Sequence, residues 1–235
     1  MTPIETAERA LRRGTLWILV ALPLLAAVYV RALLFTPAEA VQGLAQKIFY
    51  IHAPSAWVAF LAFGLVGVTS VIYLFLKDAR LDLFAASSAE VGMVFTTEVL
   101  ITGPIWGKTI WGTWWTWDAR LTLTLFLWFV MLAYLVLRSA VHEPGQRARY
   151  SAVLGILGAL LVPFIHVSVY LFRTLHPMPV VLKPGRPTLP GSMLVTLVFA
   201  FLVFTFFFVS LLRYRYALAR LADARAHDAA ERADA

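Results

Sequence analysis

The sequence contains no cysteine and few charged residues. Only 14% of its 235 residues are charged, whereas a soluble domain carries roughly a quarter. Without thiols, the chain has no structural disulfide and no cysteine-based zinc or redox centre. The missing charge is replaced by apolar residues, which make up 61% of the chain and give a mean hydropathy of +0.79. This composition predicts an integral membrane protein whose main solvent is lipid.

Two further absences narrow the function. The chain has no Gly-rich phosphate loop of the P-loop type, so any ATP dependence must come from another subunit. Its net charge of +7 would be compatible with a nucleic-acid partner, but the basic residues lie at the ends of apolar runs, as membrane anchors do. We therefore expect no nucleic-acid partner.

Six apolar segments approach the roughly 20 residues needed to cross a bilayer core of about 30 Å. They cover residues 16–35, 56–76, 91–106, 121–137, 152–172 and 193–212. The sequence therefore predicts an all-α integral membrane protein with six transmembrane helices, a membrane domain at 1–212 and a charged tail at 213–235. The first segment also resembles a signal peptide, but it is long for one, and we expect it to be a span. The Ala-rich tail predicts a solvated helix, and contact with a cytoplasmic ATPase is the alternative.

The basic residues also predict the orientation. If the N-terminus is cytoplasmic, thirteen of the twenty Lys and Arg residues lie on that side, five of them in the tail. The positive-inside rule then places both termini in the cytoplasm. The loops at 36–55, 107–120 and 173–192 would face the outside.

The second outer loop holds an unusual cluster of tryptophans in the stretch WGTWWTWDAR. Its members are Trp111, Trp114, Trp115, Trp117 and Asp118. On a helix, all of them except Trp117 would share one face, although Gly107 and Gly112 leave an irregular loop as the alternative. An aromatic belt at the lipid interface explains one or two indoles per helix end. We interpret residues 106–120 as a platform for a large, flat and mostly apolar ligand.

Two histidines lie on the same side as these tryptophans. His52, in YIHAPSAW, precedes Pro54, which we expect to begin the second helix. His176, in RTLHPMP, follows the fifth span. Two neutral imidazoles from different loops could supply both axial ligands of a haem iron. Five cations on this side could meet the haem propionates: Lys108, Arg120, Arg173, Lys183 and Arg186.

Two ionisable side chains lie within the spans. An intramembrane ionisable residue is a candidate functional residue. For His166 we favour a packing role over that of an inner haem ligand. For Glu98 the sequence names no partner, and a packing role and a functional role are equally supported.

These motifs carry a family resemblance. WGTWWTWDARLT, flanked by YIHAPSAW and TLHPM, resembles the signature of the WWD-domain haem-handling proteins of cytochrome c maturation. The length and the six-span layout resemble the C-subunit family of the haem-release ABC complex (CcmC), since the longer relatives have more spans. The resemblance covers the chain from about Trp17 to Leu212. The proline-rich loop after His176 and the charge of Glu98 depart from the family pattern.

The resemblance implies a haem-handling protein rather than an enzyme. Haem b would be held non-covalently on the periplasmic side of the bacterial inner membrane, between His52 and His176 and over the tryptophan platform. The implied partners are a membrane-anchored haem chaperone (CcmE-like), ABC ATPase and permease subunits (CcmA- and CcmB-like) and a small single-span subunit (CcmD-like). Two other classes stay open from the residues alone: a membrane b-type cytochrome subunit, which needs paired mid-span histidines, and a permease, which needs a polar path through the bilayer.

Overall fold

The computed structural model describes residues 2–181 and 183–233, and this part of the chain contains helices and loops but no strand. The helices are α1 (Pro3–Val30), α2 (Phe49–Leu76), α3 (Ala79–Trp111), α4 (Ala119–Ala140), α5 (Pro144–Leu171) and α6 (Gly191–Ala233). Each of the six is long and apolar enough to cross a membrane. The predicted all-α, six-span membrane fold is therefore confirmed.

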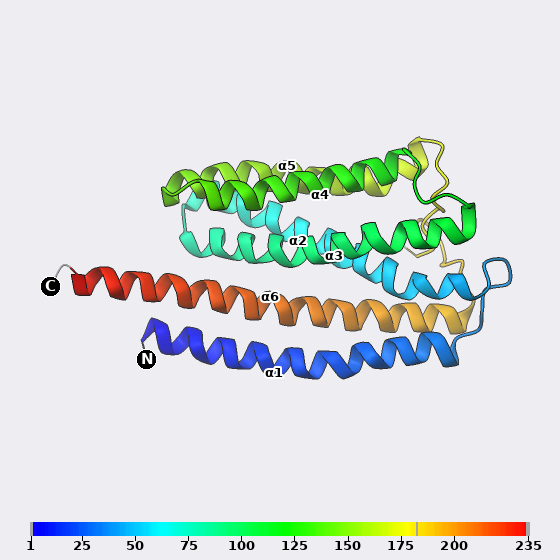
Figure 1. The fold of residues 1–235 in the computed structure, drawn as a ribbon, viewed down its shortest axis with the longest axis horizontal. Coiled ribbons are helices and arrows are strands. Elements are labelled where there is room, and N and C mark those ends of the chain that lie inside the picture. The colour runs from blue at the N-terminus through cyan, green and yellow to red at the C-terminus, as the bar shows by residue number, and fades with distance from the viewer. Residues whose placement is uncertain (1, 182, 234–235) are drawn as a thin grey trace.

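The helices lie nearly parallel in one bundle (Figure 1). Helices α2 and α3 pack against each other at the centre, α1 runs along α6, and α4 and α5 form a pair that packs on α2. Both termini lie at one end of the bundle, and the loops before α2, after α3 and after α5 meet at the other end. The segments with His52, the tryptophans and His176 are thus gathered at a single end. The cytoplasmic placement of the termini stays a prediction.

Local signals set the helix boundaries near this end. A 3₁₀ turn (Leu44–Ile48) leads directly into α2. The expectation that Pro54 begins the second helix is therefore wrong, because this turn starts the helix at Phe49 and Pro54 lies inside it. A proline inside a helix removes one backbone hydrogen bond. Because α2 begins at Phe49, His52 lies in its first turn.

Small residues allow the helices to approach closely. A Cβ atom added to Gly67 on α2 would lie 2.3 Å from the Cβ of Ala159 on α5, and one added to Gly14 on α1 would lie 3.0 Å from the Cα of Tyr214 on α6. In lipid, helices associate through such close van der Waals packing, because burial of apolar surface gives little driving force there. These glycines let α2 approach α5 and let α1 approach α6.

The predicted tail is a direct continuation of α6. The helix crosses the predicted boundary between 212 and 213 without a break, and it packs along α1. Ala217 and Leu221 are buried, and Arg225 forms an ion pair with Glu8 of α1 at 3.2 Å. Tail residues 213–233 are therefore helical, as predicted, with one side covered by α1. Residues 1, 182, 234 and 235 of the two predicted domains lie outside the described residues.

Candidate functional site

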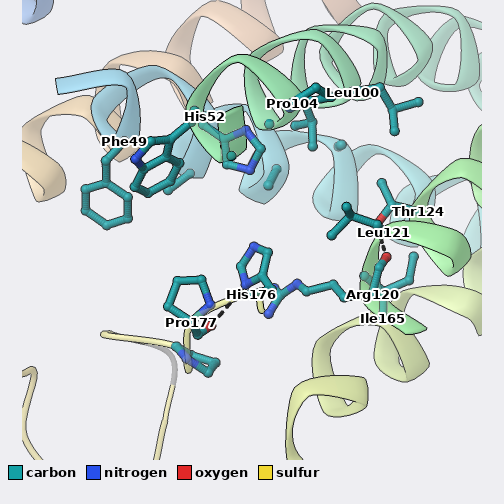
Figure 2. A pocket seen from close by; sticks show the side chains of 18 of the residues that line it. Phe49, His52, Leu100, Pro104, Arg120, Leu121, Thr124, Ile165, His176 and Pro177 are labelled. Atoms are coloured by element: carbon teal, nitrogen blue, oxygen red, sulfur yellow. Dashed lines mark hydrogen bonds between the residues drawn. The ribbon is translucent and has the colours of Figure 1, made fainter. Parts of the chain in front are cut away.

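A large cavity, which we call the three-loop cavity, opens where the three loops meet (Figure 2). Its volume, including the mouth open to solvent, is about 1680 Å³. Helices α2 to α6 line it, together with Gln42 and the loops at 113–116 and 176–181. The lining is mainly apolar, and its ionisable members among the described residues are His52, Arg120, His166 and His176. The space suits a large apolar ligand with a few polar contact points.

His52 is held on the α2 wall of the cavity by side chains of α3. Its ring Nδ1 lies 2.8 Å from the hydroxyl oxygen of Thr102, and that hydroxyl lies 2.7 Å from the backbone carbonyl oxygen of Glu98. The ring packs edge-on against Trp106, with centroids 5.8 Å apart and planes at 70°. A Cβ atom on Gly103 would lie 3.2 Å from the ring. The absence of that Cβ therefore lets the imidazole rest against the helix.

His176 approaches from the other wall of the cavity. It lies in the loop between α5 and α6, and Figure 2 shows its ring across the space from His52. Its Nδ1–H donates to the carbonyl oxygen of Pro177 at 3.0 Å, because a carbonyl can only accept. Burial, reinforced by the nearby Arg120 guanidinium, lowers the pKa of His176 from 6.5 to about 4. The imidazole is thus neutral at pH 7, with the Nε2 lone pair available.

Arg120 is the only one of the five predicted cations that lines the cavity in the described part of the chain. Its Nη1 is buried and has no hydrogen-bond partner among the described residues. Lys108 instead donates to the carbonyl oxygen of Gly112 at 2.9 Å, at the end of α3. The remaining cations lie outside the cavity lining: Arg173, Lys183 and Arg186. Arg120 therefore offers a positive charge that a bound anionic group could neutralise.

The tryptophan segment is an irregular loop, so the prediction of one helical face is wrong. Gly112 takes a left-handed conformation, with φ of 74°, and ends α3, while the next helix begins only at Ala119. Three of the four predicted indoles still line the cavity, Trp111 from the end of α3 and Trp114 and Trp115 from the loop. Trp117 lies outside the lining and is 77% exposed. It packs edge-on against Trp115, with centroids 5.7 Å apart.

Asp118 is a helix cap. Its Oδ1 accepts the backbone N–H of Arg120 at 3.0 Å and of Leu121 at 3.1 Å, and its Oδ2 accepts the hydroxyl of Thr116 at 3.1 Å. It is outside the cavity lining and its carboxylate serves as a helix cap, while its place on the rim of the platform stays a prediction. The physical reason for the cap is that the four N–H groups at the start of a helix need acceptors, and aspartate is among the best residues for this position. Asp118 thus fixes where α4 begins, and with it the place of Arg120.

Comparison with known proteins identifies the family. Residues 3–230 match the model of the family described as Heme exporter protein C, CcmC. The chain belongs to the CcmC family. Heme exporter protein C of Bradyrhizobium diazoefficiens is 36% identical over 195 residues, which cover 83% of this chain and 74% of that protein. The Haemophilus influenzae protein of the same name is 38% identical over 189 residues, covering 79% and 76%. The Escherichia coli K12 protein is 37% identical over 142 residues, covering 60% and 58%. The resemblance inferred from the tryptophan and histidine motifs is confirmed.

In this member of the CcmC family, sequence reasoning missed the α3 side of the site. Trp106 was included in the platform range without a role, although it contacts His52 and donates from its indole N–H to the side-chain oxygen of Gln42 at 3.1 Å. Thr102 was not singled out. The sequence does contain a signal for this side of the site: Gly103 and Gly107 lie four residues apart and share one helix face. Glycines in this spacing allow a ring or a neighbouring backbone to approach the helix closely.

The two intramembrane candidates differ in position. His166 lines the three-loop cavity from α5, and its ring centroid lies 6.4 Å from that of Tyr170 one turn later. Its packing role stays a prediction. Glu98 lies outside the lining, and its backbone carbonyl oxygen accepts the hydroxyl of Thr102 at 2.7 Å. Glu98 therefore supports His52 through its backbone, and the role of its carboxyl group stays a prediction.

Proposed function

We propose that this CcmC family member binds haem in the three-loop cavity and presents it to a haem chaperone during cytochrome c maturation. The observation that carries the proposal is the pair of imidazoles, His52 and His176, on facing walls of one apolar cavity (Figure 2). They come from segments more than a hundred residues apart in the chain. Two neutral histidine side chains are a common axial ligand set for low-spin haem iron.

The other lining groups fit the rest of a haem molecule. The indoles Trp111, Trp114 and Trp115 offer flat apolar surfaces against which a porphyrin gains dispersion and quadrupole contacts. The buried Arg120 guanidinium, whose Nη1 has no partner among the described residues, suits a propionate carboxylate. Because the chain has no cysteine, thioether attachment is ruled out. Haem b is thus proposed as exchangeable cargo, in keeping with a haem-handling protein rather than an enzyme.

The same geometry supports presentation to a partner. Trp114, which lines the cavity, is 59% exposed, and Trp117, which packs against Trp115, is 77% exposed. A haem bound at an open mouth keeps an edge accessible to a second protein. We propose a membrane-anchored CcmE-like chaperone as that protein. We further propose CcmA- and CcmB-like ABC subunits and a CcmD-like single-span subunit as the rest of a haem export complex.

We place the protein in the bacterial inner membrane with the cavity on the periplasmic side. The support is the excess of Lys and Arg residues at the end of the bundle that holds both termini, opposite the three loops. A membrane b-type cytochrome is less well supported. It needs histidines at matched depth on facing helices, and His166 is the one described histidine deeper in a span than His52.

A spectroscopic titration tests the proposal. Purified protein in detergent, mixed with ferric haem, should develop a low-spin bis-imidazole spectrum. His52→Ala and His176→Ala should each remove that spectrum, and the double variant should bind no more tightly than either. His142→Ala is the matched control, because His142 is exposed between α4 and α5 at the opposite end of the bundle. If both single variants keep the full low-spin spectrum, the proposed function is wrong.

A further inference from the structure

The hydrogen bonds behind His52 determine which ring nitrogen carries its proton. Thr102 Oγ1 lies 2.7 Å from the carbonyl oxygen of Glu98 and 2.8 Å from Nδ1 of His52. The carbonyl can only accept, so the single hydroxyl proton of Thr102 must lie between the two oxygens. Otherwise two acceptors would face each other at 2.7 Å without a proton. The hydroxyl oxygen is then the acceptor toward His52, and Nδ1 must be the donor.

We propose that Thr102 is a positioning residue that holds His52 in its Nδ1–H tautomer and leaves Nε2 as the haem-iron ligand. The inference rests on the proposed function and names the group that prepares one of its two ligands. In the opposite arrangement, with Thr102 donating to Nδ1, the proton would sit on Nε2 and that nitrogen could not bind iron. A hydrogen bond from the second ring nitrogen also makes a histidine ligand more basic and fixes its ring plane.

Two neighbours of Thr102 restrict the ring further. Gly103, the next residue on α3, leaves room for the imidazole, whose Cε1 would lie 3.2 Å from any added Cβ. Trp106, one turn along the same helix, packs edge-on against the ring at 5.8 Å. One short stretch of α3 therefore sets the tautomer, the distance and the tilt of His52. The hydrogen bond is part-buried on the wall of a mainly apolar cavity, where such bonds are stronger than in water.

The second ligand is prepared differently. Nδ1–H of His176 donates to the backbone carbonyl of Pro177, the neighbouring residue in the loop. A side-chain substitution cannot remove this backbone acceptor. Of the two proposed ligands, only His52 therefore has its tautomer set by a side chain. Removing the Thr102 hydroxyl should therefore alter one axial bond and leave the other intact.

The experiment compares Thr102→Val, Thr102→Ala and Thr102→Ser with the wild type. The valine variant nearly keeps the shape of threonine but has no hydroxyl, so haem affinity should fall about 10–100-fold, and the reduction potential of bound haem should rise because the ligand is less basic. Thr102→Ser keeps the hydroxyl and should restore both values. Thr102→Ala serves the same purpose as valine if the valine variant fails to fold.

The matched control is Thr97→Val. Thr97 lies on the same helix, donates to the carbonyl oxygen of Met93 at 2.8 Å and accepts a ring N–H, from Trp128, at 2.9 Å. Unlike His52, this ring partner lies outside the cavity lining. This variant loses equivalent bonds and should bind haem with unchanged affinity and potential.

The outcomes separate the two proposals. If His52→Ala weakens haem binding while Thr102→Val and Thr102→Ala match the wild type, the inference about Thr102 is overturned and the proposed function stands. Equal losses in the serine and valine variants would also overturn it, because they would indicate a packing effect. If His52→Ala itself has no effect, the inference about Thr102 fails, and if His176→Ala has none either, the proposed function fails as well.

Discussion

Replacing Arg120 by methionine should weaken haem binding without destabilising the empty protein. The guanidinium is held in the cavity lining with Nη1 buried and unpartnered among the described residues. A hydrogen bond to a charged group contributes about 1.5–3 kcal/mol, and each 1.4 kcal/mol corresponds to about tenfold in affinity. Loss of one propionate contact should therefore raise the haem Kd by about 10–150-fold. Methionine keeps much of the side-chain volume and removes a charge that is costly to bury.

The assay compares haem with its propionate dimethyl ester. Each porphyrin is titrated into wild-type and Arg120→Met protein, followed by the Soret band, while thermal unfolding of the empty proteins monitors stability. The wild type should prefer free haem over the ester by about 10–150-fold, and the variant should bind the two with similar affinity. Arg173→Met is the control, because Arg173 is exposed and outside the cavity lining. It should keep the wild-type preference.

Two results would refute this reasoning. An undiminished preference for the free acid in Arg120→Met would show that another group meets the propionates. A large fall in the unfolding temperature of the empty variant would show that the guanidinium stabilises the fold rather than awaiting an anion.

Three further predictions concern pH, capping and packing. Because burial lowers the pKa of His176 to about 4, this ligand is neutral above that value, and haem affinity should stay flat from pH 7 to about pH 5. A loss of about threefold in a Soret titration between pH 7 and pH 6, as expected for an ordinary histidine with a pKa of about 6.5, would contradict this. Asp118→Ala removes the cap of α4 and should lower the free energy of unfolding by about 0.5–2 kcal/mol, whereas Asp118→Asn should keep the cap and the stability. Equal destabilisation of both variants in denaturant unfolding would show that the charge of Asp118 matters more than its hydrogen bonds. Gly67→Ala places a Cβ atom 2.3 Å from that of Ala159 and should lower the free energy of unfolding by about 1–3 kcal/mol. Gly64→Ala, where nothing lies within 4 Å of the added Cβ, should lower it much less. Similar unfolding temperatures for the two variants would refute the packing argument.

The six spans were predictable because lipid imposes a strong local rule. Each segment that crosses the bilayer must satisfy its own backbone hydrogen bonds, so a sufficiently long apolar run is a helix whatever its neighbours are. The family was predictable for a similar reason. The tryptophan stretch and the two histidine motifs lie in a fixed order along the chain and need no fold to be recognised.

The conformation of the tryptophan segment was not predictable from spacing. The offsets of Trp111, Trp114 and Trp115 suit a helical face, but Gly112 takes a left-handed conformation and the Asp118 carboxylate starts a new helix. These end signals are as local as the spacing itself. The sequence alone does not say which of the two signals prevails.

The sequence by itself determined how many times the chain crosses the membrane and which motifs share one end, because hydropathy and loop order are properties of short segments. Only the tertiary structure decided that Arg120, of five candidate cations, reaches the cavity and that the Thr102 hydroxyl contacts His52. Those assignments depend on how α2, α3 and α4 pack against one another. Such contacts between distant segments are set by the fit of side chains across helix interfaces, which the order of residues along one helix does not specify.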